Sequence, residues 1–137
     1  MIEEYKNFVN LGIVRNKNGE VLIIKRKVIE KGSDGARLTW AFPGGKQKNE
    51  NREECVEREI LSETGYKVKV SRQISLRVHP QFTKILCYFL CELINENKIQ
   101  EPEEPDEIEE AKWVKPEDLK NYFTTNLDPN VAKELKI

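Results

Sequence analysis

Two carboxylates on one predicted helix are the residues of this sequence best placed to do chemistry. Glu59 and Glu63 stand four positions apart, so their side chains project from the same helix face. Two like charges at this spacing repel each other and destabilise a helix slightly. A hard divalent cation such as Mg²⁺ or Mn²⁺ would reverse that sign, because both ions prefer oxygen ligands. The alternative for any such pair is a solvated acidic helix face.

The helix that carries this pair is predicted over Arg52 to Thr64. Asn51 and Glu54 have the spacing of a capping box, in which each side chain accepts a hydrogen bond from the backbone N–H of the other residue. Gly65 stands where a left-handed C-terminal cap would fall. The sequence therefore predicts both ends of the acidic helix.

Eight positions around this helix form a long pattern with fixed spacing. They are Gly44, Glu50, Arg58, Glu59, Ile60, Glu63, Gly65 and Tyr66. The stretch resembles the signature of the Nudix hydrolases, and the preceding Trp40-Ala41-Phe42-Pro43 resembles the usual lead-in of that family. A pattern of this length is highly specific, unlike a lone glycine motif.

The stretch departs from the family pattern at two points. Ser62 stands where the family has the first Glu of a Glu-Glu pair, which is commonly a metal ligand, so one carboxylate is missing. Many members begin the motif at the second glycine of Pro-Gly-Gly, whereas the match here begins at Gly44. We therefore expect a tightened loop before the helix.

The resemblance implies roles for four side chains of the motif. Glu59 and Glu63 would bind Mg²⁺, with Mn²⁺ as the alternative ion, and one of them would orient the attacking water. Glu50 would pair with Arg58 and hold the loop against the helix. All four are predicted to belong to the catalytic machinery.

The resemblance also points to a metal ligand in the acidic segment Glu101–Glu110, where seven of ten residues are acidic. Many members place a metal-binding Glu a few residues ahead of an aromatic residue, which here is Trp113. Glu107 is the first choice for this ligand and Glu110 the second. The prolines and like charges of the segment predict that it is otherwise solvated and irregular.

The resemblance also implies substrate-binding roles for six residues, and simpler roles remain open for three of them. Arg26 could end a strand, Arg37 could lie solvated on a loop, and Asp128 could cap a helix. The resemblance implies an Asp or Asn near this point that reads a purine edge, and Asp128 and Asn126 are the candidates. His79 is expected to be a strand-end turn residue. The six residues are Gly44, Gly45, Lys46, Arg26, Arg37 and Asp128.

The elements that position these residues follow from periodicity and turn signals. A buried strand over 21–27 follows an Asn-Gly turn, and a loop is expected over 28–38. This order of strands and helices predicts an α/β protein with a mixed sheet and helices on both faces. The resemblance implies the same α/β/α sandwich, as one domain over 1–137. Further strands are expected over 8–15, 66–70, 73–78, 84–94 and 111–114, and further helices over 116–121 and 130–135.

Composition narrows the class of protein. The net charge is −1 and the pI is near 6.0, which gives no electrostatic case for binding nucleic acid or a membrane. No apolar run approaches the roughly 18 residues of a membrane span, and no leader is recognised, so a cytoplasmic location is expected. The three cysteines, Cys55, Cys87 and Cys91, are predicted to be buried free thiols.

Together with these residues, the resemblance implies a metal-dependent hydrolase that cleaves the pyrophosphate linkage of a nucleoside diphosphate joined to another group. The favoured substrate is a nucleoside triphosphate, including an oxidised one, which would give the monophosphate and pyrophosphate. The alternatives are hydrolysis of ADP-ribose or another nucleotide sugar, and a sensor that binds a nucleotide without cleaving it. The expected partner is a small nucleotide, and the protein is expected to be a monomer or homodimer.

Overall fold

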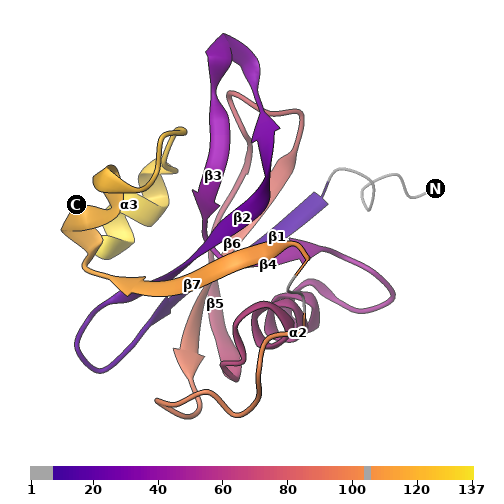
Figure 1. Ribbon diagram of the computed structural model, residues 1–137, viewed down its shortest axis with the longest axis vertical. Helices are drawn as coiled ribbons and strands as arrows, with labels where there is room; N and C mark the ends of the chain where they lie inside the picture. Colours follow the sequence, from indigo (N-terminus) through magenta and orange to yellow (C-terminus); the bar gives the residue numbers. More distant parts are fainter. Residues whose placement is uncertain (1–7, 104–105) are drawn as a thin grey trace.

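A mixed β-sheet forms the centre of the computed structural model, which describes residues 8–103 and 106–137 (Figure 1). The described residues form seven strands in the order β3-β2-β1-β6-β5, with β4 paired to β1 and β7 paired to β2. The central strands β1 and β6 are parallel, and the other pairs are antiparallel. The strands are β1 (Phe8–Arg15), β2 (Val21–Lys31), β3 (Arg37–Ala41), β4 (Gly44–Lys46), β5 (Val68–Val78), β6 (Ile85–Leu93) and β7 (Ile108–Val114).

Helices cover both faces of the sheet, as predicted (Figure 1). Helix α2 (Arg52–Thr64) packs Val56 and Ile60 against one face. The 3₁₀ helix η2 (Pro116–Asn121) and helix α3 (Pro129–Leu135) pack their apolar side chains against the other face. Residues next to each other in the central strands therefore enter different cores, as Ile13 and Val14 do in β1. This arrangement confirms the α/β/α sandwich.

The ends of α2 are those that the sequence predicts. The Asn51 side chain accepts from the Glu54 backbone N–H at 2.8 Å, and Glu54 Oε1 accepts from the Asn51 backbone N–H at 3.2 Å. Gly65 ends the helix in the left-handed conformation at φ +83°. At its centre the helix lies directly on β1, because a Cβ on Gly12 would lie only 2.4 Å from Ile60 Cδ1.

The segment expected to be a loop over 28–38 is mostly a β-hairpin. Strand β2 continues to Lys31, the short 3₁₀ helix η1 (Ser33–Gly35) turns the chain, and β3 begins at Arg37. The register of the β2–β3 pair shifts between Lys25 and Glu30. Because such an irregularity breaks the alternation of side chains, the pattern does not look like a strand.

Register shifts and pairing also explain the other corrections. The two short strands expected over 66–70 and 73–78 are one strand, β5, which carries shifts between Val70 and Arg72 and between Gln73 and Ser75. Strand β7 begins at Ile108, inside the acidic segment, because β2 is long enough to pair with it there. Strands β3 and β4 were not expected, and the predicted helix over 116–121 is 3₁₀ rather than α.

The three thiols are free and buried, as predicted. Burial raises the pKa of Cys87 to about 11 and that of Cys91 to about 12. Among the described residues, no helix has the length and apolar character needed to span a membrane.

Candidate active site

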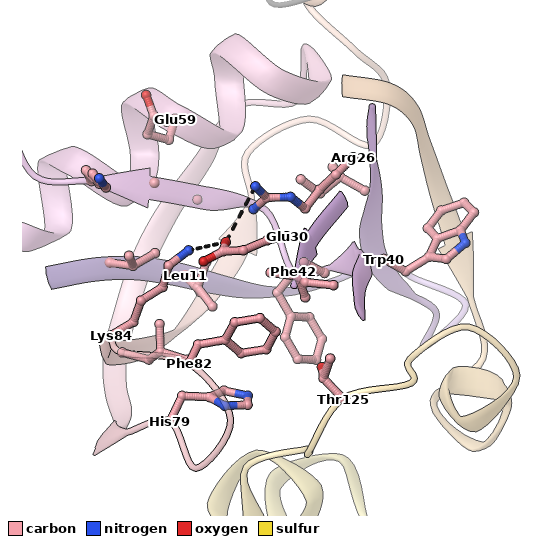
Figure 2. Close-up of a pocket in the computed structure, with 18 of the residues that line it drawn as sticks. Leu11, Arg26, Glu30, Trp40, Phe42, Glu59, His79, Phe82, Lys84 and Thr125 are labelled. Carbon is pink, nitrogen blue, oxygen red and sulfur yellow. Dashed lines mark hydrogen bonds and ion pairs between the residues drawn. The ribbon is translucent and has the colours of Figure 1, made fainter. Parts of the chain in front are cut away.

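One cavity of about 650 Å³ lies where α2, the end of β2, the start of β6 and the segment before α3 meet (Figure 2). Its volume is in the usual range for a small-molecule site. Eight of the predicted site residues line it: Arg26, Gly44, Gly45, Lys46, Glu59, Glu63, Glu107 and Asp128. The cavity therefore brings together the acidic helix and most of the residues expected to bind substrate.

Glu63 is buried at the inner end of the site. Its Oε1 accepts a hydrogen bond from the Gly44 backbone N–H at 2.8 Å. Gly44 has φ +149°, and a Cβ there would lie 2.0 Å from the Asn10 carbonyl oxygen. Only glycine allows β4 to pass this close to β1 and still donate its N–H to the carboxylate.

Glu59 lies against the next glycine of β4. A Cβ on Gly45 would lie 2.1 Å from Glu59 Oε2, so the space that a larger residue would fill is occupied by the carboxylate. The two glycines of the motif therefore both help to position a carboxylate of α2. Gly44 holds one carboxylate by its N–H, and Gly45 leaves room for the other.

Arg58 links the loop before α2 to the acidic face. Its Nε and Nη2 donate to Glu50 Oε1 at 3.1 and 2.6 Å, which confirms the predicted pair. Its Nη1 donates to Glu59 Oε1 as well. The Arg58 guanidinium holds the pKa of Glu50 below its usual range. Neither Glu50 nor Arg58 lines the cavity, so the pair positions Glu59 and the loop rather than meeting a substrate.

Cys55 of α2 contacts the end of β4, a contact that was not predicted. Its thiol lies 3.6 Å from the Gly45 carbonyl oxygen and 3.4 Å from that of Lys46. Burial raises the pKa of Cys55 to about 11, so the sulfur keeps its proton at neutral pH and can donate it to a carbonyl. The contact joins α2 to the end of β4, where the loop before the helix begins.

The acidic side chains suit a hard cation only in part. Glu59, Glu63 and Glu107 all line the cavity, and the Glu107 carbonyl accepts from the Lys27 N–H at 2.9 Å, which anchors that segment to β2. Within residues 8–103 and 106–137, no three Asp, Glu, His or Cys side chains are grouped closely enough to enclose an ion. Mg²⁺ usually takes one or two carboxylates and fills its other positions with water and phosphate, so the pair on α2 fits it.

Ser62 and Glu110 do not line the cavity among the residues that the structure describes. The Ser62 carbonyl accepts from the Glu103 N–H at 2.7 Å, which joins α2 to the acidic segment. Arg37 is exposed at the start of β3, paired in the sheet with Lys31, and also lies outside the cavity. The structure does not bring Arg37 to the other predicted residues.

Asp128 lines the cavity, but the protein itself uses its carboxylate. Oδ1 accepts from the Asn130 and Val131 N–H groups at 2.8 and 3.0 Å, which caps α3. Oδ2 accepts from Ser75 Oγ at 2.8 Å and lies 3.3 Å from Arg77 Nε. The capping role is therefore confirmed. Asn126, the other candidate for reading a purine, also lines the cavity and remains exposed.

His79 lies buried in the turn that follows β5. Its Nδ1 accepts from the Gln81 N–H at 3.0 Å, and its ring meets Phe82 edge-on with centroids 5.0 Å apart. Burial, with the nearby charges of Arg77 and Lys84, lowers its pKa below 6.5. The ring is therefore neutral at pH 7 and organises the turn, as expected.

The aromatic end of the cavity was missed from the sequence. Phe42 lies edge-on to Phe123, with centroids 4.9 Å apart, and to Tyr88 at 6.5 Å. These rings and Phe82 come from segments far apart in the chain, and each looks like an ordinary core residue on its own. No local pattern could have grouped them, because the sheet order alone brings them together.

Comparison with known proteins agrees with this geometry. The family model for the NUDIX domain matches residues 8–135. The chain belongs to the NUDIX family. A protein of Bacillus subtilis (strain 168), named as a candidate 8-oxo-dGTP diphosphatase, is 30% identical over 115 residues, which span 83% of this chain and 70% of the relative.

Two solved structures show the same fold as this NUDIX protein. An ADP-ribose pyrophosphatase from Streptococcus suis 89-1591 matches with a TM-score of 0.67 at 17% identity, over 95% of this chain and 90% of that one. A MutT protein from Methanosarcina mazei Go1 matches with a TM-score of 0.65 at 22% identity, over 99% and 94%. Family membership makes the chain a MutT-like NUDIX pyrophosphohydrolase, which acts on phosphoric anhydrides of small nucleotides.

Proposed function

We propose that this NUDIX protein hydrolyses a purine nucleoside triphosphate, including oxidised forms, to the monophosphate and pyrophosphate with the help of Mg²⁺ or Mn²⁺. The observation that carries the proposal is the division of one cavity into two ends. Glu59 of α2 lies at one end, and Phe42, Phe82 and His79 lie at the other (Figure 2). A nucleobase has flat apolar faces that aromatic side chains accept, whereas a phosphate chain needs a charged end. The relative named for 8-oxo-dGTP supports the same substrate class.

The residues have distinct parts in this reaction. Glu59 and Glu63 would hold the cation, which supplies positive charge beside the phosphates and lowers the pKa of a bound water. A water oxygen bonds to phosphorus, the bridging P–O bond breaks, and the leaving phosphate keeps the electron pair. A carboxylate beside the water accepts or directs its proton. Glu50 and Arg58 keep Glu59 in place.

The first experiment measures turnover on a panel of nucleotides. Wild-type protein with Mg²⁺ is given dGTP, 8-oxo-dGTP and ADP-ribose, and Glu63→Gln is compared with it. The Gln side chain can still accept from Gly44 but loses its charge, so we expect kcat to fall roughly 100-fold or more. Glu53→Gln is the matched control, since it changes an exposed residue of the same helix outside the cavity.

Each result has a clear meaning. Turnover of the triphosphates that collapses in Glu63→Gln and persists in Glu53→Gln supports the proposal. Faster turnover of ADP-ribose moves the substrate class to nucleotide sugars. Nucleotide binding that is equally strong in EDTA, with no turnover of any compound, contradicts the hydrolase and favours a sensor.

A further inference from the structure

Two cationic side chains meet one carboxylate oxygen of Glu30 inside the cavity, and of these three residues only Arg26 has a role assigned above. Glu30 Oε1 lies 2.5 Å from Lys84 Nζ and 3.6 Å from Arg26 Nη2. Arg26 and Glu30 come from the end of β2, and Lys84 precedes β6. All three line the cavity, so the junction faces the space in which a substrate would lie (Figure 2).

The junction connects the two ends of the cavity. Arg26 pairs in the sheet with Ile108, next to Glu107, on the acidic side. Lys84 belongs to the turn that carries His79 and Phe82, on the aromatic side. The backbone N–H of His79 donates to the backbone carbonyl of Lys84 at 3.0 Å. In the view of Figure 2, the Glu30 carboxylate lies between Glu59 and the aromatic rings.

The charges of the junction do not balance. Two cations, Lys84 and Arg26, share a single carboxylate. Arg26 is also directed by its own strand, because its Nε donates to the Val28 carbonyl at 3.2 Å. A phosphate carries more charge and more acceptor oxygens than one carboxylate, so it would engage both cations more completely.

A purely structural purpose for the junction is already served by other contacts. The β2–β3 hairpin and the turn before β6 are joined by the Ser33 N–H, which donates to the Gln81 carbonyl at 2.9 Å. Gly32 packs so tightly there that a Cβ would lie 2.4 Å from the same carbonyl oxygen. The segments therefore stay together without the ion pairs of Glu30.

We propose that the Glu30 carboxylate occupies the place of a substrate phosphate, and that Lys84 and Arg26 bind the phosphate nearest the nucleoside once it displaces Glu30. Lys84 becomes a substrate-binding residue, and Glu30 an internal competitor that weakens the binding of short anionic ligands. The inference rests on the proposed function, because it assumes that the base lies at the aromatic end and the outer phosphates lie near α2.

The test measures the affinity of dGMP by calorimetry in EDTA, where neither a metal ion nor hydrolysis contributes. We expect Glu30→Gln to bind dGMP about three- to tenfold more tightly than wild type, and Lys84→Gln about three- to tenfold more weakly. Glu109→Gln and Lys69→Gln make the same charge changes outside the cavity and should alter the affinity less than about twofold. Glu109→Gln also removes an ion pair, the one between Glu109 and Lys25 at 3.0 Å, so the control includes the loss of such a contact.

Deoxyguanosine provides the chemical control. It lacks the phosphate, so its affinity should be the same in all five proteins. The opposite signs of the two cavity variants exclude a structural tie, because loss of a tie would lower thermal stability and weaken binding in both. The proposal is overturned if both variants bind dGMP more weakly, if neither differs from the controls, if deoxyguanosine shows the same shifts, or if dGMP binds to none of the proteins.

The outcome is separable from that of the proposed function. Opposite shifts in dGMP affinity without turnover of any nucleotide would keep the phosphate site and remove the hydrolase. Turnover that depends on Glu63, with unchanged dGMP affinity in both variants, would keep the hydrolase and remove the phosphate site.

Discussion

Single residues of the cavity are held by contacts that the protein makes with itself. Glu63 is anchored by Gly44, Glu59 by Arg58, and Asp128 by the N-terminus of α3. Side chains fixed in this way lose little conformational freedom when a ligand arrives, which favours binding and catalysis. His79 is held in the same manner, and its protonation can be followed because it is the single histidine of the sequence.

The stability of the fold should depend on the protonation of His79. Its pKa in the folded protein is lowered by burial and by the charges of Arg77 and Lys84. A hydrogen bond to the Asn126 backbone and the charge of Glu30 offset only part of this shift, so the unfolded chain binds the proton more readily. The free energy of unfolding should therefore be highest above pH 6.5 and fall as the pH drops through that value, by less than about 1.4 kcal/mol per pH unit. Urea unfolding between about pH 7.5 and pH 5.5 measures this slope.

The variant His79→Gln isolates the effect. It should flatten the slope in this pH window, whereas Glu50, whose pKa is lowered by Arg58, contributes only at more acidic pH. An equal slope in wild type and His79→Gln would show that other groups carry the pH dependence.

The sequence predicted some residue roles well and could not predict others. The Glu50–Arg58 pair and the position of Glu59 and Glu63 on one face follow from spacing inside a single segment. Glu30, Lys84 and Phe82 come from separate strands and turns, so their meeting depends on the sheet order. Arg37 and Glu107 illustrate the same limit. Both were plausible site residues from the sequence, but Glu107 lines the cavity and Arg37 does not.

At the level of elements, α2 determines the geometry of the acidic end. It lies on β1 at Gly12, on β4 at Gly45, and beside β5, where Glu57 Oε2 accepts from the Val70 N–H at 3.0 Å. Its cap, its apolar positions and its C-terminal glycine all predicted the same boundaries, which is why this element was predicted correctly. The β2–β3 hairpin and β5 were not, because register shifts hide their periodicity.

Removing the cap of α2 should destabilise the protein by a predictable amount. Asn51→Ala loses the side-chain acceptor for the Glu54 N–H and one half of the capping box. We expect a loss of about 1 kcal/mol in the free energy of unfolding, which lowers Tm by about 3–5 °C. Calorimetry with Asn49→Ala, an exposed residue of the preceding loop, gives the comparison. Equal melting temperatures for the two variants would show that the cap is replaced by other contacts.

At the level of the whole molecule, the acidic site exists only when helix and sheet are assembled. Glu59 and Glu63 come from α2, but both are placed by β4, which is held in turn by β1. The unfolded chain has no equivalent arrangement. A ligand of this site therefore stabilises the complete fold rather than one segment.

Magnesium should raise the stability of the entire protein for this reason. At a concentration about 100-fold above its Kd, we expect Mg²⁺ to add about 2.7 kcal/mol to the free energy of unfolding, and EDTA to remove the gain. Glu59→Gln should lose most of this increase, and Glu53→Gln should retain it. Thermal unfolding with and without Mg²⁺ gives the result. If the Tm of the wild type is the same with and without Mg²⁺, the result argues against a cation at these carboxylates.

The parallel pairing of β1 with β6 also bears on how the chain is made. A ribosome releases β1 early, and β2 follows at once to form an antiparallel neighbour, but β6 emerges only after α2 and β5. Until then one edge of β1 has no strand to pair with, and such an edge can recruit strands from other chains. A nascent chain that stalls before Ile85 would therefore be prone to aggregate, and the slow closure of this long-range pair would set the pace of folding during synthesis.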